Sequence, residues 1–191
     1  MKQLKESFLA LLLLTVITGV IYPVITTLIG QFCFNYKANG SLIKVKGEIV
    51  GSELIGQNFS SDKYLWGRPS STSDFAYNPL ASSGSNLGPL NPALLSGIHD
   101  RVAILESINK GIAIPVDLVT ASASGLDPEI SLASAYYQIP RIAKARNISN
   151  DAVKVIVDQI ANEPLFGIWG EHTVNVLLVN LALDQKEIEE K

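Results

Sequence analysis

Cysteine and histidine are scarce in this chain of 191 residues, and their scarcity argues against several kinds of site. The one cysteine, Cys33, cannot build a disulfide framework or a cysteine-based zinc site, because both need several thiols. The two histidines, His99 and His172, lie far apart in the sequence and offer little material for a histidine-rich metal centre. We therefore expect neither a disulfide-stabilised fold nor a metal site.

The signature motifs of several enzyme classes are also missing. The sequence has no GxxxxGKS/T phosphate loop, no GxGxxG turn, no HExxH zinc motif and no GxSxG nucleophile elbow. Only 17% of the residues are charged, the net charge is −3, and Lys and Arg are not clustered. Binding to the phosphates of a nucleic acid needs such clusters, so the composition argues against a nucleic-acid-binding protein.

A long uncharged run stands out instead at the start of the chain. No charged residue lies between Glu6 and Lys37, and residues 8–29 are almost entirely apolar. A membrane helix needs about 20 apolar residues, because about 30 Å of hydrocarbon is crossed at 1.5 Å per residue. A cleaved signal peptide has a shorter apolar region and ends in a small-x-small site, which the residues after Gly30 do not provide. We therefore predict that residues 1–36 form a short N-terminus and a single retained membrane anchor.

Gly19 and Pro23 lie inside this predicted span. Proline has no backbone N–H, so we expect the helix to be kinked or interrupted between these two residues. The glycine and scattered threonines are small enough for close approach of another membrane helix, although a threonine hydroxyl also bonds readily to its own helix. Lysines flank the span on both sides, so the positive-inside rule leaves its orientation open.

Residues 37–183 have the mixed pattern of a soluble domain. Val and Ile alternate in part between residues 43 and 57, which predicts two short strands. A β-branched run at 114–120 predicts a buried strand, whereas 173–183 is ambiguous between helix and strand. The charged tail, 184–191, is expected to fray. The predicted fold class is α+β, with one membrane helix followed by one mixed domain.

Three helices are predicted in this domain from their capping residues. The pair Asn91–Pro92 combines an N-cap residue with a proline suited to the first helical position. A second helix is expected from about Ser131, and Pro140 should break or restart it. A serine and an asparagine at 149–150 predict the start of a third helix.

The composition changes sharply between residues 60 and 92. Of these 33 residues, 19 are Ser, Thr, Gly, Pro or Asn, which is typical of a loop or linker. Five of the nine aromatic residues beyond the membrane region nevertheless lie in or beside this segment. Aromatic side chains bury large areas when they have a surface to pack on, so we predict an ordered and functional loop.

Two loops rich in small polar residues are candidates for binding, one from Ser82 to Pro89 and one from Thr120 to Gly125. Their hydroxyls, amides and backbone donors could hold an anion or clamp the backbone of a partner. The same small residues could equally serve tight packing of the chain. The candidate binding residues in the two loops are Ser83, Gly84, Ser85, Asn86, Thr120, Ser122, Ser124 and Gly125.

Three charged residues near these loops are the candidates for chemistry. Arg68 could tie the aromatic loop down through carbonyl contacts, or it could present a cation to a partner. Asp117 and Asp127 could form an acid/base pair, but an aspartate before proline is more typical of a turn or a helix cap. Ser122 or Ser124 could be a nucleophile only with a positioned base, and no histidine lies near them in sequence.

Longer strings of residues identify a family. They are Tyr22-Pro23, Gly56-Gln57, Tyr64 to Ser70 (YLWGRPS), Tyr77-Asn78-Pro79-Leu80-Ala81 with the Ser/Gly loop to Pro92, Pro115 to Pro128 (PVDLVTASASGLDP), 138–146 and 174–183. On these strings the chain resembles, over nearly its whole length, the C subunits of the Kdp potassium-transporting P-type ATPases of bacteria and archaea. Ser83, Glu129 and Leu132 depart from the usual pattern, in which glycine, histidine and proline are common at these positions.

The resemblance implies a non-catalytic accessory subunit of a membrane complex. Its partners would be a channel-like potassium-binding subunit, the ATP-hydrolysing P-type subunit and a very small single-span subunit. The family is described as a catalytic chaperone that raises the affinity of the pump for ATP, and ATP binding is attributed to it. The soluble domain would lie on the outer face of the cell membrane, with the N-terminus in the cytoplasm. Gln57, Arg68, Asn78 and Asp117 join the loop residues as candidate partner- or ligand-binding positions.

The residues alone leave two other functions open. One is a membrane-anchored hydrolase that uses Ser122 or Ser124 with Asp117. The other is a membrane-anchored module that binds a ligand on its own. An accessory subunit is expected to occur in a complex, whereas a binding module is expected to be stable as a monomer.

Overall fold

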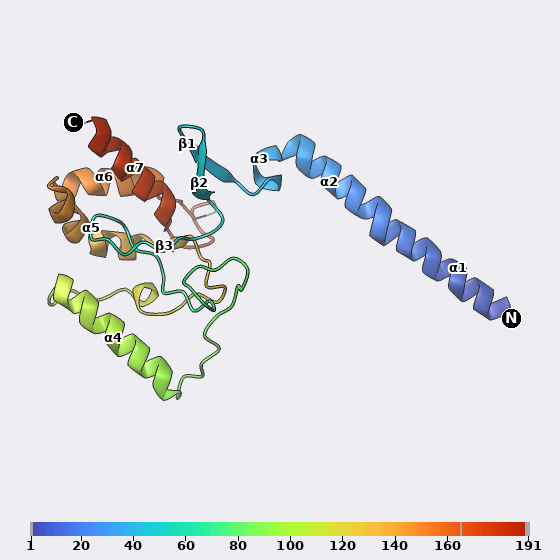
Figure 1. The fold of residues 1–191 in the computed structure, drawn as a ribbon, viewed down its shortest axis with the longest axis horizontal. Coiled ribbons are helices and arrows are strands. Elements are labelled where there is room, and N and C mark those ends of the chain that lie inside the picture. Colours follow the sequence, from blue (N-terminus) through green and yellow to red (C-terminus); the bar gives the residue numbers. More distant parts are fainter. Residues whose placement is uncertain (1, 165, 190–191) are drawn as a thin grey trace. The chain divides into compact units, whose positions relative to one another are not determined.

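The computed structural model describes residues 2–164 and 166–189. The chain divides into two compact units, residues 1–50 and residues 51–191 (Figure 1). The first contains the apolar N-terminal helix, and the second is a mixture of helices and a small sheet. The predicted α+β class with one apolar N-terminal helix is confirmed.

The N-terminal helix runs from Lys2 to Cys33 and is, in the described part of the chain, the one helix long and apolar enough to cross a membrane. It comprises α1 (Lys2–Val16), a turn of π-helix η1 (Ile17–Ile21) and α2 (Tyr22–Cys33). At 1.5 Å per residue its length is about 48 Å, which exceeds the hydrocarbon core of a bilayer. None of its most apolar stretch is buried within the chain, as expected of a helix that lipid or other helices cover.

The predicted interruption of this helix is confirmed as one π-helical turn. Pro23 has no N–H to donate to the carbonyl four residues earlier, that of Gly19. The Tyr22 amide bonds to the Ile17 carbonyl, five residues back, which is the π-helical spacing. The Thr18 hydroxyl donates to a carbonyl of its own helix at 2.7 Å, the alternative to a contact with a second helix.

The two short strands predicted after the span are also present. A short helix, α3 (Asn35–Ala38), precedes β1 (Leu42–Val45), which pairs with β2 (Glu48–Ser52). The turn residues Lys46 and Gly47 both have positive φ, 51° and 90°. Positive φ at both central residues is the requirement of a tight type I′ hairpin turn.

Three helices surround the main core of the second unit: α5 (Leu132–Arg146), α6 (Asn150–Ile160) and α7 (Val176–Glu189). Their buried faces meet each other and one side chain of the preceding loop. The most deeply buried members of this core are Leu65, Ile130, Ala135, Ile142, Val153, Val157, Val174, Val179 and Leu183. Figure 1 shows these helices grouped together at one end of the unit.

A short antiparallel sheet adjoins these helices. β3 (Glu129–Ser131) pairs with β4 (Thr173–Asn175), with Ile130 opposite Val174. Both of these central side chains are buried in the main core. The sheet therefore joins the segment before α5 to the segment before α7.

The long helix α4 (Pro92–Ile108) and the short 3-10 helix η2 (Val116–Leu118) form a second, smaller core. Its buried members are Leu105, Leu118, Val119 and Tyr137, and the indole of Trp66 packs against them. This second core fixes α4 against α5 and against the loop that contains Trp66.

The predicted starts of α4, α5 and α6 are confirmed by their caps. The side chains of Asn91, Ser131 and Ser149 each accept a hydrogen bond from an amide two or three residues later, at 2.9 to 3.1 Å. Each bond satisfies an amide that has no partner within its own helix. These caps are local signals, which explains why the sequence predicts them correctly.

The strand predicted at 114–120 is wrong. The segment forms η2 and its flanking turns, with the Leu118 amide bonded to the Pro115 carbonyl at 3.2 Å. Pro115 cannot donate to a β-ladder, and the Asp117 side chain accepts bonds from the start of α5 instead. Leu118 and Val119 of this segment are buried without forming a strand.

The break predicted at Pro140 is also wrong, because α5 continues through it to Arg146. Pro140 is exposed, while Ile139 and Ile142 on either side are buried in the main core. Packing of these neighbours compensates for the backbone bond that proline cannot make.

The ambiguous segment 173–183 contains both structures, since β4 ends at Asn175 and α7 begins at Val176. The tail that was expected to fray, 184–191, is helical as far as Glu189, and its last two residues lie outside the described part of the chain. Asp184 in this helix accepts hydrogen bonds from Arg146 at 2.8 Å and from Tyr64 at 3.0 Å. These bonds attach the last helix to α5 and to the loop.

The loop between β2 and α4 has backbone groups that bond to side-chain amides, where a β-strand would bond to a neighbouring strand. The Asn180 side chain accepts from the Leu65 amide at 2.7 Å and donates to the Leu65 carbonyl at 3.0 Å. The Gln138 side chain does the same for Trp66, at 2.9 and 3.1 Å. Both amide side chains are fully buried, so they satisfy backbone groups that water cannot reach.

Arg141 adds a guanidinium to the same anchor. It donates to the carbonyls of Asp62 at 2.6 Å and Tyr64 at 3.0 Å, and lies 3.7 Å from the centre of the Trp66 ring. Burial lowers the pKa of Arg141 to about 10, which still leaves the guanidinium charged at neutral pH. The loop is thus held by one charged and two amide side chains, on α5 and α7.

We predict that Gln138→Leu lowers the free energy of unfolding by about 3 kcal/mol, because it leaves two buried backbone groups of Trp66 unpaired. Denaturant unfolding of the purified full chain, followed by tryptophan fluorescence, measures the change. The control Gln159→Leu makes the same chemical change on an exposed position of α6 and should shift stability by less than about 0.5 kcal/mol. Equal effects of the two substitutions would contradict the anchoring role of Gln138.

Candidate functional site

The segments predicted to bind, 82–89 and 120–125, lie within two longer loops of the second unit that contact each other. The long loop, residues 53–91, joins β2 to α4, and the short loop, residues 119–128, joins η2 to β3. We call their contact region the loop junction. Its hydrogen bonds run from Ser122 N–H to Pro69 O at 3.3 Å, Gly56 N–H to Leu126 O at 2.9 Å, Ser70 Oγ to Gly125 O at 2.8 Å and Ser82 Oγ to Ser124 O at 3.0 Å.

Glycines make this close approach possible. A Cβ atom on Gly125 would lie 2.7 Å from the Ser83 carbonyl oxygen and 2.5 Å from a methyl group of Thr72, and its φ is +69°. A Cβ on Gly84 would lie 2.9 Å from the Ala123 carbonyl oxygen. The opposite loop therefore fills the space above both glycines, and here the small residues serve tight packing.

Tyr77 is buried and forms hydrogen bonds with earlier residues of the long loop. Its φ is +61°, a region that bulky residues rarely adopt. Its amide donates to Ser70 Oγ at 2.9 Å, and its hydroxyl donates to the Arg68 carbonyl at 2.6 Å. Added Cβ atoms on Gly56 and Gly67 would lie only 2.5 and 2.4 Å from the Tyr77 side chain. Burial raises the pKa of Tyr77 to about 12, so the hydroxyl remains a donor at neutral pH.

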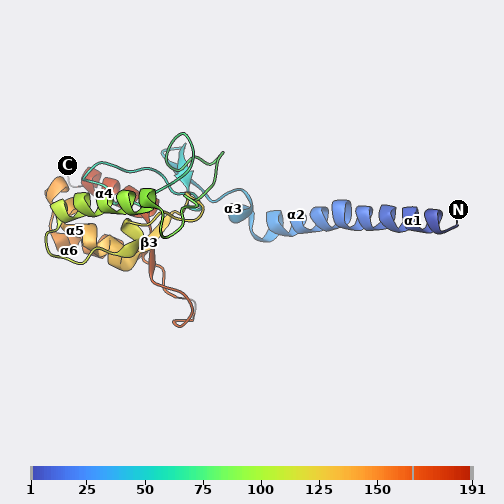
Figure 2. The ribbon, with the colours of Figure 1, turned by 90° about the horizontal axis from the view of Figure 1, so that it is seen from below.

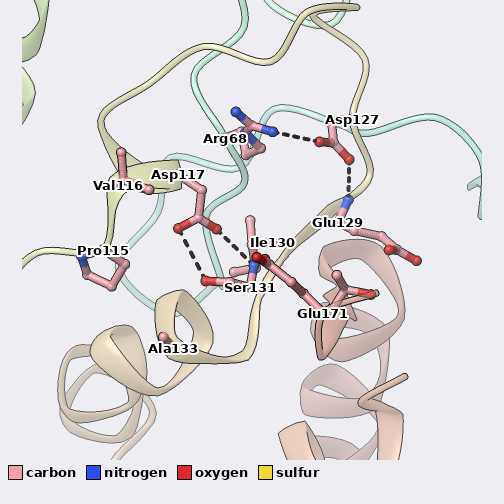
Figure 3. Close-up of a pocket in the computed structure, with 11 residues that line it drawn as sticks. Arg68, Pro115, Val116, Asp117, Asp127, Glu129, Ile130, Ser131, Ala133 and Glu171 are labelled. Carbon is pink, nitrogen blue, oxygen red and sulfur yellow. Dashed lines mark hydrogen bonds and ion pairs between the residues drawn. The ribbon is translucent and has the colours of Figure 1, made fainter. Parts of the chain in front are cut away.

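Arg68 and Asp127 form an ion pair across the loop junction at 3.2 Å (Figure 3). Arg68 also donates to the Ala121 carbonyl at 3.4 Å, which is a carbonyl contact of the kind that the first of its two expected roles requires. The second Asp127 oxygen accepts from the Glu129 amide at 3.1 Å, which confirms the predicted turn. Both side chains are about 30% exposed, so the pair contributes little stability and chiefly fixes position.

Asp117, on η2, forms hydrogen bonds with residues at the start of α5. It accepts from the Ser131 amide at 2.8 Å and from the hydroxyls of Ser131 and Ser134. The hydroxyls of Ser122 and Ser124 accept from amides of their own loop, at 2.9 and 3.1 Å. The structure therefore does not bring Asp117 into hydrogen-bonding contact with either serine, as the hydrolase interpretation would need.

The other predicted residues are spread along the two loops. Asn78 is buried and bonds within the long loop, to the Ser73 carbonyl and the Leu80 amide. Ser85 and Asn86 are exposed, whereas Gln57 is half-buried and packs beside Gly51. The Thr120 hydroxyl donates to a carbonyl four residues earlier, at 2.8 Å.

An acidic cleft of about 460 Å³ adjoins the loop junction (Figure 3). Its charged lining consists of Arg68, Asp117, Asp127, Glu129 and Glu171. Four carboxylates against one guanidinium, which is already paired with Asp127, make the cleft negative. These residues do not fit the triphosphate of ATP, which the carboxylates would repel.

The residues that hold the junction in place include several that the sequence reasoning missed. Ser70 and Tyr77 lie within the quoted strings, but nothing local shows what they contact. Gln138 and Asn180 lie 72 and 115 residues from their partners in the long loop, so local patterns contain no signal for them.

We predict that Gly125→Ala destabilises the chain by about 3 kcal/mol, because it combines an unfavourable φ with overlap against the long loop. The matched control is Gly111→Ala, at a glycine with φ +78° and nothing within 4 Å of an added Cβ. Only the unfavourable φ acts there, at about 1–2 kcal/mol. Denaturant unfolding and limited proteolysis of the long loop compare the two. Equal loss of stability would show that the loops are not in contact.

Comparison with known proteins adds to this geometry. Residues 4–185 match the family model described as "KdpC: K+-transporting ATPase, c chain". Relatives named "Potassium-transporting ATPase KdpC subunit" include that of Methylococcus capsulatus, 54% identical over 94% of this chain and 96% of the relative. Those of Herminiimonas arsenicoxydans and Janthinobacterium sp. (strain Marseille) are 53% and 50% identical, each over 95% of this chain and 97% of the relative. The resemblance in the sequence is thereby confirmed, and the chain belongs to the KdpC family, the c chains of K+-transporting ATPases.

Proposed function

We propose that this chain is an accessory subunit of an ATP-driven potassium uptake complex in the cell membrane, with no catalytic centre of its own. Its partners would be the ATP-hydrolysing P-type subunit, the channel-like potassium-binding subunit and the small single-span subunit. The N-terminus would lie in the cytoplasm and residues 37–183 outside the membrane. Membership of the KdpC family supports this proposal.

Two exposed leucines of the long loop support the proposal that this loop binds another subunit. Leu80 and Leu90 are 95% and 91% exposed. The Leu80 amide is bonded to the buried Asn78 side chain at 3.0 Å, so the leucine is presented in a defined position. Exposed apolar side chains on an ordered loop favour a protein interface, because little conformational entropy is lost on binding.

We call Leu80 and Leu90 the docking surface. In this proposal, the candidate residues of the loop junction hold the loop that carries it in place. Arg68, Ser122 and Gly125 each make a contact between the two loops, and Ser85 and Asn86 are exposed. The apolar N-terminal helix supplies the second attachment, to lipid and to neighbouring membrane helices.

We further propose that any effect on ATP affinity is indirect. The acidic cleft is unsuited to ATP, and in this proposal the chain acts by stabilising the form of the hydrolysing subunit that binds ATP. A complex assembled without this chain should then need more ATP for half-maximal activity. An unchanged ATP dependence would contradict the chaperone role and leave the proposed accessory role standing.

Purification in mild detergent from potassium-starved cells, followed by mass spectrometry, tests the proposed function. We expect the tagged chain to bring a P-type ATPase subunit and a channel-like subunit with it in a fixed ratio. Recovery of the chain as a lone monomer would overturn the proposal and favour a stand-alone binding module.

The docking surface has its own test. The double substitution Leu80→Asp, Leu90→Asp places charges where we expect an apolar partner surface, and should reduce recovery of the other subunits at least tenfold. The control Ile112→Asp changes another exposed apolar residue, after α4, and should leave recovery unchanged. Unfolding experiments should show both variants folded. Normal recovery with the double variant would exclude the leucines from the interface.

A further inference from the structure

A hairpin between α6 and β4 projects from the second unit (Figure 2). We call residues 162–164 and 166–173, the part of this segment that the structure describes, the aromatic hairpin. Its base is fixed by two backbone bonds between Asn162 and Thr173, at 2.8 and 3.4 Å, and by the Asn162 side chain, which donates to Glu129 at 3.1 Å. The hairpin therefore has a defined origin beside the β3–β4 sheet.

Large apolar side chains occupy the tip of this hairpin and are left to solvent. Phe166 and Ile168 are each 79% exposed, and Trp169 is 68% exposed. The rings of Phe166 and Trp169 meet edge-on, with centres 6.2 Å apart. These three residues belong neither to the main core nor to the second core. Their apolar side chains therefore contribute little to folding. Trp and Phe at such positions are typical of the central contacts of protein interfaces.

The described backbone of the tip contains a turn and a residue in the left-handed conformation. Phe166 has φ +55°, and the Gly167 amide bonds to the Pro164 carbonyl at 2.8 Å. A left-handed conformation costs about 1 kcal/mol for a residue with a Cβ, and glycine or asparagine would adopt it at lower cost. The sequence has phenylalanine at a position that folding alone would not favour.

The charges around the tip are of one sign. The aromatic hairpin contains Glu163 and Glu171 and has no lysine or arginine. Glu171 also lines the acidic cleft, where Figure 3 shows it near Glu129 and Asp127 at the same edge. Glu171, two residues after Trp169, therefore connects the apolar tip to the negative cleft along the chain.

We propose that the aromatic hairpin docks into an apolar pocket, bordered by Lys or Arg, on another subunit of the potassium uptake complex. The inference rests on the proposed function and names a second contact surface, separate from Leu80 and Leu90. An anionic lipid surface would suit the aromatic tip but would be repelled by the acidic border. A second copy of this chain would bring a second acidic cleft against the first. An apolar pocket with a basic rim on a different subunit would match both the apolar tip and the acidic residues beside it.

Photo-crosslinking in the assembled complex is the test. p-Benzoylphenylalanine replaces Trp169 in the full chain, and in a control variant it replaces Val155, which is 53% exposed on α6. We expect ultraviolet light to join position 169, and not position 155, to another subunit. Crosslinks from position 169 only to lipid or to a second copy would overturn the inference. The absence of any crosslink from a chain that still co-purifies would overturn it and leave the proposed function standing, whereas a chain that purifies alone contradicts both.

Substitutions separate the apolar contribution from the charged one. Trp169→Ser should speed loss of the chain from the immobilised complex at least tenfold, and Val155→Ser should leave the rate unchanged. Glu171→Lys should also speed loss, and added salt should weaken the wild-type complex, whereas Glu106→Lys makes the same charge change on α4 without effect. Equal rates for the hairpin variants and their controls would overturn the inference.

Discussion

The structure of the second unit depends on hydrogen bonds between buried side chains and the backbone of the long loop. These bonds take the place of the partners that a β-strand would have. The amides of Gln138 and Asn180 each bond to both backbone groups of one loop residue, and Arg141 covers the carbonyls beside them. These three side chains come from α5 and α7, so the packing of the helices determines the path of the loop. Burial makes each bond costly to lose.

The loop junction follows from this anchor. With Leu65 and Trp66 fixed, the next residues meet the short loop, where Gly125 permits contact that any side chain would prevent. Tyr77 closes the long loop on itself from a conformation that only surrounding packing can maintain. The result is an ordered surface that displays apolar side chains to solvent.

Local signals in the sequence predicted much of this fold. The caps at Asn91, Ser131 and Ser149 depend on neighbours within three residues, so they could be identified from the sequence. The strand at 114–120 and the break at Pro140 were wrong because tertiary contacts decided both segments. The site was harder still, since the residues that hold the two loops together lie 42 or more positions apart in sequence. Composition predicted that the loop is ordered but could not show what it packs against.

Hydrogen exchange of the long loop in the purified full chain tests the central claim most directly. The amides of Leu65 and Trp66 lie in irregular structure but are bonded to buried side chains, so we predict protection similar to that of α5. In the assembled complex, the segment containing Leu80 and Leu90 should gain protection while the anchor remains unchanged. Rapid exchange at Leu65 and Trp66 in the free chain would contradict the account, because the loop would then have no fixed surface to offer a partner.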